Sequence, residues 1–412
     1  MINIANFLTL RYDPYLSNTN IRCITQHEII QNRQRRSITI PTPKEIENTI
    51  RRTIREKIEN IENYREKRIA IAVSSGIDSN VILSLIRKEF PSIEIDCITV
   101  SFEDSLEDEA NCTRKIAESQ NASFHEVNVE NLLTDLPMLL SVIKEPRWNI
   151  YQYYYIKKAK TISSILFTGD GGDELFAGYT FRYKKFLDFI KSDYSWIGKV
   201  HSYLLCHERD WIPDQEDIFA PKIKFEWLSI YLILKKYFAN NLDPFEQILL
   251  ADYNGKLKYD FMPTTLKFFK FFNINGVTPL LSNELIDLSF QIPAFLKYDV
   301  KNNLGKIPLR EIIKTNNITY YNIIKNKDTK IGFGMNLSTF WKRIAKEIVT
   351  SYLEKARIFE DKIINREWYN KSLIKIRESN NERYINKMLQ IFSLEIWYKM
   401  FITAEINVNS SI

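Results

Sequence analysis

The sequence predicts an α/β protein in which a parallel sheet is followed by a mainly helical region. Short apolar runs recur between residues 69 and 167 and alternate with stretches of helical periodicity. This alternation is typical of βαβ units, which build parallel sheets with helices on both faces. From residue 181 the pattern changes to long, aromatic-rich helical segments. We therefore expect an α/β core over residues 41–180 and an appended helical region over 181–412 that completes the domain.

The composition is typical of a soluble globular protein and excludes a membrane-spanning or disulfide-rich one. The chain has 412 residues, 45% of them hydrophobic, and a formal net charge of +6. This length and composition suit a soluble protein with a real core, and the charge excess is too mild to indicate nucleic-acid binding. No signal-peptide core or membrane-length apolar run is present. The four cysteines are scattered without a C-x-x-C pair, so we expect reduced thiols and a cytoplasmic protein.

The first 40 residues are expected to form an N-terminal segment and linker. Residues 7–12 and 21–24 are short apolar runs that we interpret as strands, and residues 33–36 form a basic run without interleaved aromatics, typical of a solvated linker. Thr42-Pro43-Lys44-Glu45 then has the pattern of a capping box. It predicts a helix of roughly 20 residues with an apolar face made of Ile46, Ile50, Ile54, Ile58 and Ile61.

A phosphate-binding turn is predicted next. Residues 69–73 are small or β-branched apolar residues, too few for a helix, and indicate a buried strand. The sequence Ser-Ser-Gly-Ile-Asp-Ser of residues 74–79 follows, and then an apolar helical stretch at 81–86. Backbone N–H groups at such a helix N-terminus bind anions. Because Asp78 beside a phosphate requires a cation between them, the turn indicates Mg²⁺. It matches neither the Walker pattern nor a dinucleotide fingerprint.

Further strands and helices continue the alternation. We expect strands at 93–100, 124–127 and 161–167, with helices at 107–120 and 132–143. Since the carboxyl ends of parallel strands share one edge of a sheet, a ligand is expected there.

A second chemical stretch, residues 168–179, follows the last of these strands. Three glycines and three carboxylates stand within residues 168–174, which excludes a core segment. Glycines permit close approach of a phosphate, and carboxylates hold a metal ion. An EF-hand is excluded because its closing glutamate position holds Tyr179.

These two stretches resemble known motifs. Residues 74–79 resemble the SGGxDS loop of the N-type ATP pyrophosphatases, which have an adenine nucleotide alpha hydrolase-like fold. Residues 168–179 resemble the S-G-[ED]-G-[SGA]-D-E-x-F-x-G-Y signature of the asparagine synthetase-type synthetase domain. Further matches lie in register over about residues 45–345, at 102–109, 145–146, 279–281, 305–310 and 330–334.

The resemblance implies an AMP-forming carbon–nitrogen ligase. ATP and a carboxylic acid give an acyl-adenylate and pyrophosphate, and ammonia or an amine then displaces AMP. By matched position, pyrophosphate is expected at Val73, Ser74, Ser75, Gly76, Asp78 and Ser79. Adenine is expected against main-chain atoms of Val100, and the reacting groups beside Thr168 and Gly169. Asp78 and Asp173 would hold Mg²⁺, while Lys306 and Lys330 would stabilise charge at phosphorus. Asp170 would accept the proton that the nucleophile loses, although it equally suits a turn-forming role.

Several positions depart from the family pattern. The first 40 residues resemble only the tail of the family's glutaminase domain, so we expect nitrogen from free ammonia, a separate glutaminase subunit or an amine. In the acceptor region an arginine is replaced by Val277 and two acids by Asn275 and Ser282. This argues against aspartate without excluding it, so the acceptor is left open between aspartate, another small carboxylic acid, and a peptide or natural-product acid cyclised intramolecularly, as in β-lactam synthetases and lasso-peptide cyclases. Ser75 replaces a glycine, at a strain of ~1 kcal/mol if a positive φ is required.

Two other function classes remain open from the sequence. A related enzyme class adenylates a carbonyl or amide oxygen for sulfur or nitrogen insertion into a nucleobase, RNA or natural product. Cys97 on a predicted buried strand and Cys112 on a predicted helix disfavour a sulfur carrier. A non-catalytic relative is disfavoured because the predicted metal-binding and lysine positions are retained. The oligomeric state is not indicated.

Overall fold

Five parallel strands form the sheet in the computed structural model, which describes residues 2–16, 19–35, 39–60, 68–102, 107–208, 210–324 and 335–412. Their order is β3-β2-β1-β4-β5. The strands are β1 (Arg68–Ala72), β2 (Glu94–Phe102), β3 (Ser123–Val129), β4 (Ile165–Phe167) and β5 (Asn275–Val277). The predicted α/β class with a parallel sheet is confirmed.

The position of β1 explains where a ligand can bind. The chain runs outward from β1 through β2 to β3 and then returns to place β4 on the other side of β1, with Ile71 paired to Phe167. The strand order therefore reverses between β1 and β4. In open parallel sheets, ligands bind at the carboxyl ends of the strands at such a switch point.

The sheet separates two apolar cores. Side chains alternate along a strand, so Ile69 and Ile71 of β1 belong to one core while Ala70 and Ala72 belong to the other. All four are buried. Because both faces of the strand are covered, its apolar residues do not alternate with polar ones. The first core includes α3 (Pro43–Glu59), α4 (Ile77–Glu89), α5 (Glu107–Ser119), α14 (Asn283–Gln291), α15 (Ile307–Asn316) and α16 (Ile318–Ile324). The second includes α6 (Leu136–Ile143) and α7 (Gln152–Lys160).

The predicted capping box of α3 is confirmed. The Glu45 backbone N–H donates to Thr42 Oγ1 at 3.3 Å, and the Thr42 N–H donates to the Glu45 carboxylate at 2.7 Å. Ile46, Ile50, Ile54 and Ile58 are all fully buried along one face of the helix. Ile61 lies outside the described residues.

The N-terminal segment folds differently from the prediction. Residues 7–12 were expected to form a strand, but α1 (Ile4–Leu10) is a helix, capped because Asn3 Oδ1 accepts the Asn6 N–H at 3.1 Å. Its buried Phe7 and Leu8 pack into the fold, so tertiary burial selects the helix. Residues 21–24 form no strand either, and the basic run lies largely at the end of α2 (Gln26–Arg35) instead of in a linker.

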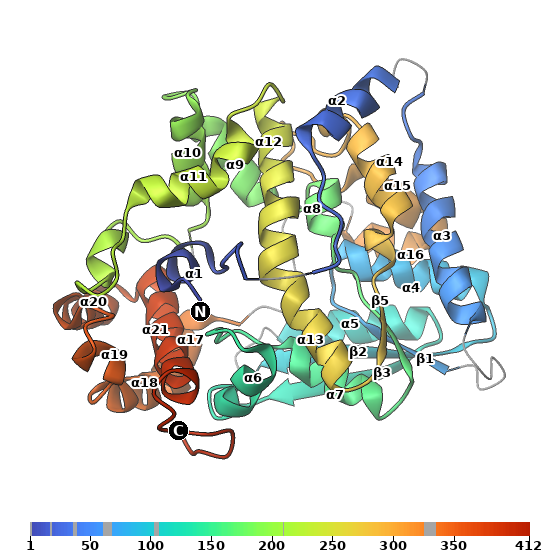
Figure 1. Cartoon of the computed structure of the whole chain (residues 1–412). Helices are drawn as coiled ribbons and strands as arrows, with labels where there is room; N and C mark the ends of the chain where they lie inside the picture. Colours follow the sequence, from blue (N-terminus) through green and yellow to red (C-terminus); the bar gives the residue numbers. More distant parts are fainter. Residues whose placement is uncertain are drawn as a thin grey trace.

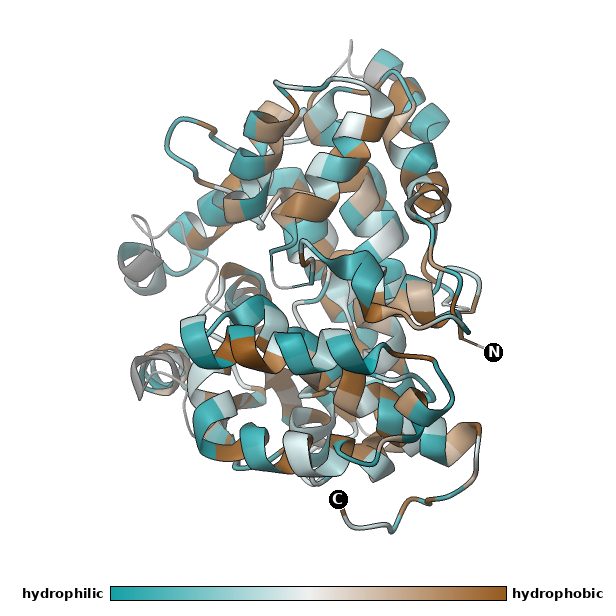
Figure 2. Ribbon diagram, turned by 90° about the vertical axis from the view of Figure 1, so that its left-hand side faces the viewer, coloured by the Kyte–Doolittle hydropathy of each residue, from teal (hydrophilic) through white to brown (hydrophobic). Residues whose placement is uncertain are grey.

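Helices dominate the rest of the chain, as predicted. Figure 1 shows one long helical path through the middle of the molecule, made of α12 (Pro244–Ala251), the π-helical segment η3 (Asp252–Phe261) and α13 (Met262–Phe271). Figure 2 shows apolar and polar residues on the same helices, as expected of helices that bury one face. The remaining elements are α8 (Gly172–Phe176), α9 (Thr180–Phe189), α10 (Trp196–Cys206), η2 (Gln215–Ile218), α11 (Trp227–Phe238), η4 (Pro279–Leu281), η5 (Ala294–Leu296), α17 (Leu337–Phe340), η6 (Trp341–Ala345), α18 (Lys346–Leu353), α19 (Arg357–Glu360), α20 (Arg366–Ser379) and α21 (Glu382–Phe401).

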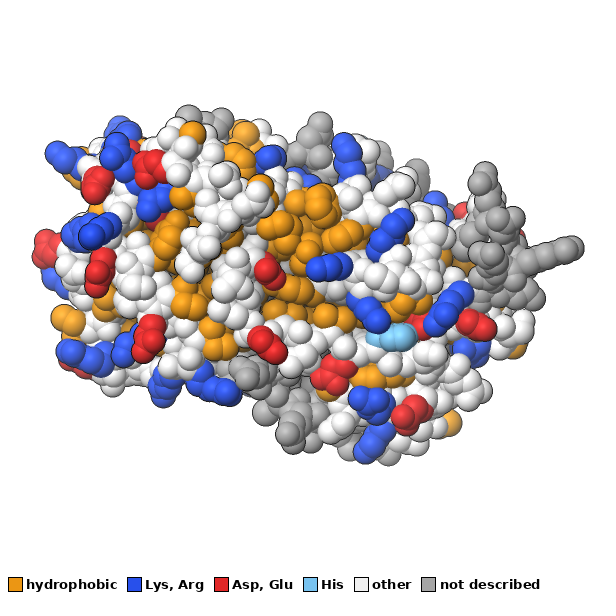
Figure 3. Space-filling view, turned by 90° about the horizontal axis from the view of Figure 1, so that it is seen from below, with side chains coloured by type: hydrophobic (Ala, Val, Ile, Leu, Met, Phe, Trp, Pro, Cys, Tyr) orange, Lys and Arg blue, Asp and Glu red, His pale blue; other side chains and the backbone are white. Residues whose placement is uncertain are grey.

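The underside of the molecule is partly apolar. Figure 3 shows hydrophobic side chains gathered there between lysine and arginine side chains. Helix α13, at the lower side in Figure 1, buries Phe268 and exposes Leu266 and Phe271. Within the part of the chain that the structure describes, no helix combines the length and apolar character needed to cross a bilayer.

Candidate active site

The turn after β1 has the geometry of a phosphate-binding loop. Strand β1 ends at Ala72 and α4 begins at Ile77, with Gly76 at the N-cap position. Glycine has no side chain to cap the helix, so the first N–H groups of α4 remain available to an anion. The loop is braced internally because the Ser74 N–H donates to Ser79 Oγ at 3.2 Å.

Two residues that the sequence reasoning missed hold this loop in place. The fully buried Asn80 donates from Nδ2 to the Ser74 carbonyl at 2.9 Å and to the Gly76 carbonyl at 2.6 Å. The Tyr320 hydroxyl donates to the Ser75 carbonyl at 2.8 Å. These bonds satisfy the carbonyls of Ser74, Ser75 and Gly76 and hold the loop backbone in place. Asn80 could have been found from the sequence, because its amide stands directly before the apolar run of α4. Tyr320 could not, because it is 245 residues away from Ser75.

Ser75 fits the loop without the strain considered from the sequence. Ten residues other than glycine have positive φ in the described chain, and Ser75 is not among them. A serine therefore adopts this backbone as readily as the glycine usual in the family, and its buried hydroxyl remains in the loop.

The loop after β4 packs directly on the phosphate loop. A Cβ added to Gly169 would lie 2.8 Å from the Ser79 nitrogen, and one added to Gly172 would collide with the Asp78 carboxylate. Gly171, at the N-cap of α8, has a φ of 94°, a conformation that glycine adopts without penalty. The clustered glycines thus allow the two loops to touch, which brings together the two stretches singled out in the sequence.

Asp78 and Asp173 converge on one lysine. The Lys306 Nζ lies 2.6 Å from Asp78 Oδ2 and 2.6 Å from Asp173 Oδ1. Burial lowers the pKa of Lys306, but the charges of Asp173 and Asp78 outweigh this cost, so the net effect is a raised pKa. The ammonium group is therefore permanently charged. Lys306 itself stands at the start of α15 with a φ of 58°, and its N–H donates to the Phe176 carbonyl at 2.9 Å.

This pair of carboxylates fits the predicted Mg²⁺ site. Magnesium takes oxygen ligands, and proteins often supply only one or two carboxylates while substrate phosphates and water supply the rest. Asp78 lies in the first turn of α4 and Asp173 in the first turn of α8, and Gly178 allows Asp173 to approach Lys306 closely. The described residues contain no group of three or more metal-ligating side chains, which is compatible with a site completed by a nucleotide.

A cavity of about 940 Å³ opens over both loops, near the upper end of the roughly 300–1,000 Å³ typical of ligand pockets. Thr168 Oγ1 donates to Asp170 Oδ2 at 2.7 Å at its edge. Val73 and Val100 lie within the described structure but not in the cavity lining; Val100 is inside β2 instead of following it. Lys330 lies outside the described residues. The predicted residues that line the cavity are Ser74, Ser75, Gly76, Asp78, Ser79, Thr168, Gly169, Asp170, Asp173 and Lys306.

Three departures from the family pattern lie outside the cavity lining and serve the fold. Asn275 and Val277 belong to β5, where the Val277 carbonyl accepts the Thr168 N–H at 2.9 Å. Ser282 caps α14, its hydroxyl accepting the Leu285 N–H at 3.4 Å. Strand β5 was not predicted, because three residues with a central glycine carry no strand signal. Its place beside β4 anchors the start of the second loop.

Charged residues that the sequence reasoning missed line the part of the cavity away from Lys306. They come from segments far apart in sequence: Arg11 follows α1, Arg147 and Asp210 lie on connections, and Lys256 and Asp260 belong to η3. Single charged residues spread over 250 positions carry no local pattern, so only the fold brings them together.

Comparisons with known proteins identify the family of the chain. A family model for asparagine synthase matches residues 30–399. Asparagine synthetase [glutamine-hydrolyzing] 1 of Bacillus subtilis is 23% identical over 321 residues, which cover 69% of this chain and 49% of that protein. The chain thus spans about half the length of this curated relative. Among solved structures, the U34-tRNA thiolase NcsA from Methanococcus maripaludis, with its [4Fe-4S] cluster, is similar at 15% identity and a TM-score of 0.23 over 71% of this chain and 83% of that one. With the match extending over most of its length and both loop motifs in one cavity, the chain belongs to the asparagine synthase family.

Proposed function

We propose that the protein is an ATP-dependent, AMP-forming synthetase that converts a carboxylate into an amide. The observation that carries this proposal is the meeting of Asp78 and Asp173 at Lys306, directly beside the N-terminus of α4, whose N-cap residue is a glycine. Both loops and both aspartates line the same cavity, which has room for a nucleotide and an acceptor together.

In the first step, an oxygen of the carboxylate forms a bond to the α-phosphorus and the bond to the bridging oxygen breaks, which releases pyrophosphate. Ser74, Ser75, Gly76 and Ser79 would hold the departing group through the loop and the helix end. Mg²⁺ bound by Asp78 and Asp173 would offset the negative charge on the phosphates. Lys306 adds a fixed positive charge at the same place.

In the second step, ammonia or an amine attacks the acyl carbon, a C–N bond forms, and the C–O bond to AMP breaks. The nitrogen must lose a proton. Asp170 lines the cavity next to Thr168 and Gly169 and would accept this proton. We propose that the nitrogen comes from ammonia, a separate glutaminase subunit or an amine substrate. We also propose that Lys330 adds positive charge and that main-chain atoms near Val100 contact adenine.

We propose that the reaction takes place in the cytoplasm because the four cysteines are scattered in the sequence without a C-x-x-C pair. The two buried thiols, Cys97 and Cys206, do not favour sulfur transfer. Burial raises the pKa of Cys97, and burial also raises the pKa of Cys206, the cysteine in the cavity lining, to about 12. A neutral thiol is a poor nucleophile.

The direct experiment incubates the protein with Mg²⁺ and ATP, ammonium and a panel of carboxylic acids, and measures pyrophosphate and AMP. Formation of both only with particular acids supports the proposal. ADP and phosphate would contradict it, and pyrophosphate formed only with a nucleobase or RNA carbonyl would support the other enzyme class.

Substitutions at the metal site sharpen this test. Asp78→Asn and Asp173→Asn should each lower kcat/KM by about 10³-fold, because each removes a ligand charge that is needed as pyrophosphate leaves. The matched control is Asp135→Asn, since Asp135 accepts a hydrogen bond from Tyr154 at 2.7 Å and lies outside the cavity lining. Activity of either site variant equal to that of the control would remove that residue from the site.

A further inference from the structure

A buried amide in the cavity lining has no partner for its oxygen. Gln152 is the first residue of α7, lines the cavity and is only 7% exposed. Within the part of the chain that the structure describes, Gln152 Oε1 has no hydrogen-bond partner. The large majority of buried side-chain polar atoms are hydrogen-bonded, because an unsatisfied one keeps the full cost of leaving water. This amide therefore indicates a ligand that donates a hydrogen bond to it.

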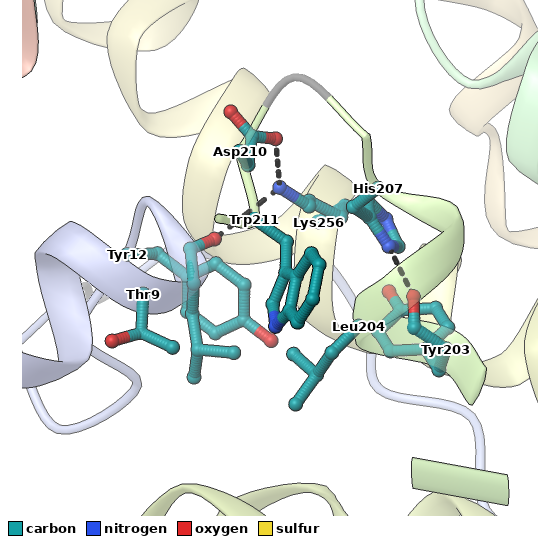
Figure 4. A pocket seen from close by; sticks show the side chains of 9 residues that line it. Thr9, Tyr12, Tyr203, Leu204, His207, Asp210, Trp211 and Lys256 are labelled. Atoms are coloured by element: carbon teal, nitrogen blue, oxygen red, sulfur yellow. Dashed lines mark hydrogen bonds and ion pairs between the residues drawn. The ribbon is translucent and has the colours of Figure 1, made fainter. Parts of the chain in front are cut away.

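The charged end of the cavity differs because its groups bind one another. Lys256 donates to the Leu10 carbonyl at 3.3 Å and pairs with Asp210 at 3.2 Å, as Figure 4 shows. Gln152 is neutral, and its amide carries N–H donors next to the acceptor Oε1. The ligand group that satisfies such an amide has a donor beside an acceptor, which is a different requirement from that of an ion-binding site.

Gln152 lies at the edge of the sheet where ligands bind. Helix α7 packs against β1, β2, β3 and β4 and leads into β4. Its other end lies at the amino ends of the strands: Lys160 donates to the Asn273 carbonyl before β5 at 2.9 Å, and Ser163 donates to the Arg68 carbonyl of β1 at 3.0 Å. The start of α7, with Gln152, therefore lies at the carboxyl ends of the strands.

The buried face of α7 directs Gln152 toward β1 and β2. Gln152, Ile156 and Ala159 have i, i+4 and i+7 spacing, so they share one helix face, and all three are buried. Ile156 and Ala159 belong to the second apolar core, as do Ala72 at the end of β1 and Val100 in β2. Side chains on a helix lean toward its N-terminus. Gln152 thus continues this face into the cavity, beyond the last apolar contacts with the two strands.

This position suits the base of a nucleotide. The phosphate loop starts at the carboxyl end of β1, and adenine is proposed to lie against main-chain atoms near Val100. A nucleotide bound in this way brings an edge of its base to the start of α7. Adenine carries an amino donor at C6 next to a ring-nitrogen acceptor, and a glutamine amide pairs with such an edge through two hydrogen bonds. Ammonia also has N–H donors, but its lone pair is needed for attack and is not free to accept from Nε2.

We propose that Gln152 determines the specificity of the site for adenine: Oε1 accepts a hydrogen bond from the 6-amino group of ATP, and Nε2 donates to the neighbouring ring nitrogen. This inference rests on the proposed function for the use of ATP. Guanine has an oxygen at C6, which faces Oε1 with a second acceptor. A site built to hydrogen-bond an N–H group rejects analogues that lack it, because its own buried polar group is then left without a partner.

The test measures nucleotide binding and does not depend on turnover. ATP, GTP and purine riboside triphosphate, which lacks the 6-amino group, are titrated by calorimetry into the full chain with Mg²⁺ and without a carboxylic acid. We expect the wild type to bind ATP at least tenfold more tightly than either analogue. Gln152→Met keeps the side-chain length and removes the amide, so it should weaken ATP binding and leave binding of purine riboside triphosphate nearly unchanged. Gln31→Met is the matched control, since Gln31 is exposed on α2 and lies outside the cavity lining.

Equal affinities of the wild type for ATP and purine riboside triphosphate would overturn the inference, and this result needs no variant. Persistence of the wild-type preference in folded Gln152→Met would overturn it as well. So would a raised KM for ammonium with an unchanged base preference, which would assign the amide to the nitrogen nucleophile.

Failure of this inference and failure of the proposed function give different results. If acids support pyrophosphate release from ATP but Gln152→Met keeps the base preference, the inference fails while the proposed function stands. If the preference for adenine depends on Gln152 but no acid supports pyrophosphate release, the proposed function fails while the base-recognition site stands.

Discussion

Replacement of Lys306 by methionine tests the electrostatic design of the site. Methionine keeps much of the side-chain length and removes the charge that lies 2.6 Å from both Asp78 and Asp173. The Lys306 and Asp173 side chains are about nine-tenths buried. Breaking a buried ion pair costs roughly 3–5 kcal/mol because the remaining charge is left without a partner. For a chain of 412 residues, the unfolding entropy is about 0.9 kcal/mol/K, so Tm should fall by roughly 3–6 °C without Mg²⁺.

The same substitution should increase the response to Mg²⁺. Two facing carboxylates that have lost their lysine gain more from a bound divalent cation, and binding to the native state raises Tm. We therefore expect added Mg²⁺ to recover more of the Tm in the variant than it adds to the wild type, while turnover stays about 10²–10³-fold lower. Differential scanning fluorimetry over a Mg²⁺ titration measures both effects. Lys314→Met on the exposed side of α15 is the control and should shift stability by less than about 0.5 kcal/mol. An unchanged Tm for Lys306→Met, with the same Mg²⁺ response as the wild type, would refute the reasoning.

Two further predictions concern buried polar groups. Asn80→Leu keeps the side-chain size but removes the donor that lies 2.9 Å from the Ser74 carbonyl and 2.6 Å from the Gly76 carbonyl. Because each buried carbonyl left without a partner costs about 1–3 kcal/mol, the substitution should lower stability and raise KM for ATP more than KM for the acid. An unaltered KM for ATP would show that the loop does not need these hydrogen bonds. Burial lowers the pKa of Lys387 to about 7, with Asp210 opposing and Lys256 and Arg11 assisting the shift. Between pH 7 and 10 the unfolded chain then holds a proton that the folded chain has lost, so this group alone makes stability rise by about 1.4 kcal/mol per pH unit. Lys387→Met should lack that rise in urea melts at pH 7, 8 and 9, and a stability profile parallel to that of the wild type would contradict the assignment.

The α/β core was predictable because its signals are local. Residues 69–73 are all apolar because the strand is buried on both faces. The loops at 74–79 and 168–179 each follow a strand directly, so both could be recognised from adjacent residues. That they meet at Lys306 follows from the strand order, in which β4 lies beside β1.

Other features depend on tertiary contacts and gave no readable signal. Residues 7–12 could form a helix or a strand by their pattern alone, and the buried contacts of Phe7 and Leu8 decide for a helix. Strand β5 is three residues long and exists because it pairs with β4. Arg11 reaches the cavity only because α1 packs against α21 and η3 through buried lysines.

The central claim is that a carboxylate is activated as an acyl-adenylate, and an isotope measurement tests it most directly. When the carboxylic acid carries ¹⁸O in both oxygens, attack on the α-phosphorus transfers one of them to AMP as the C–O bond breaks in the second step. Mass spectrometry should therefore find AMP with one ¹⁸O and the amide with the other. AMP without ¹⁸O, or ¹⁸O in phosphate alongside ADP, would contradict the account.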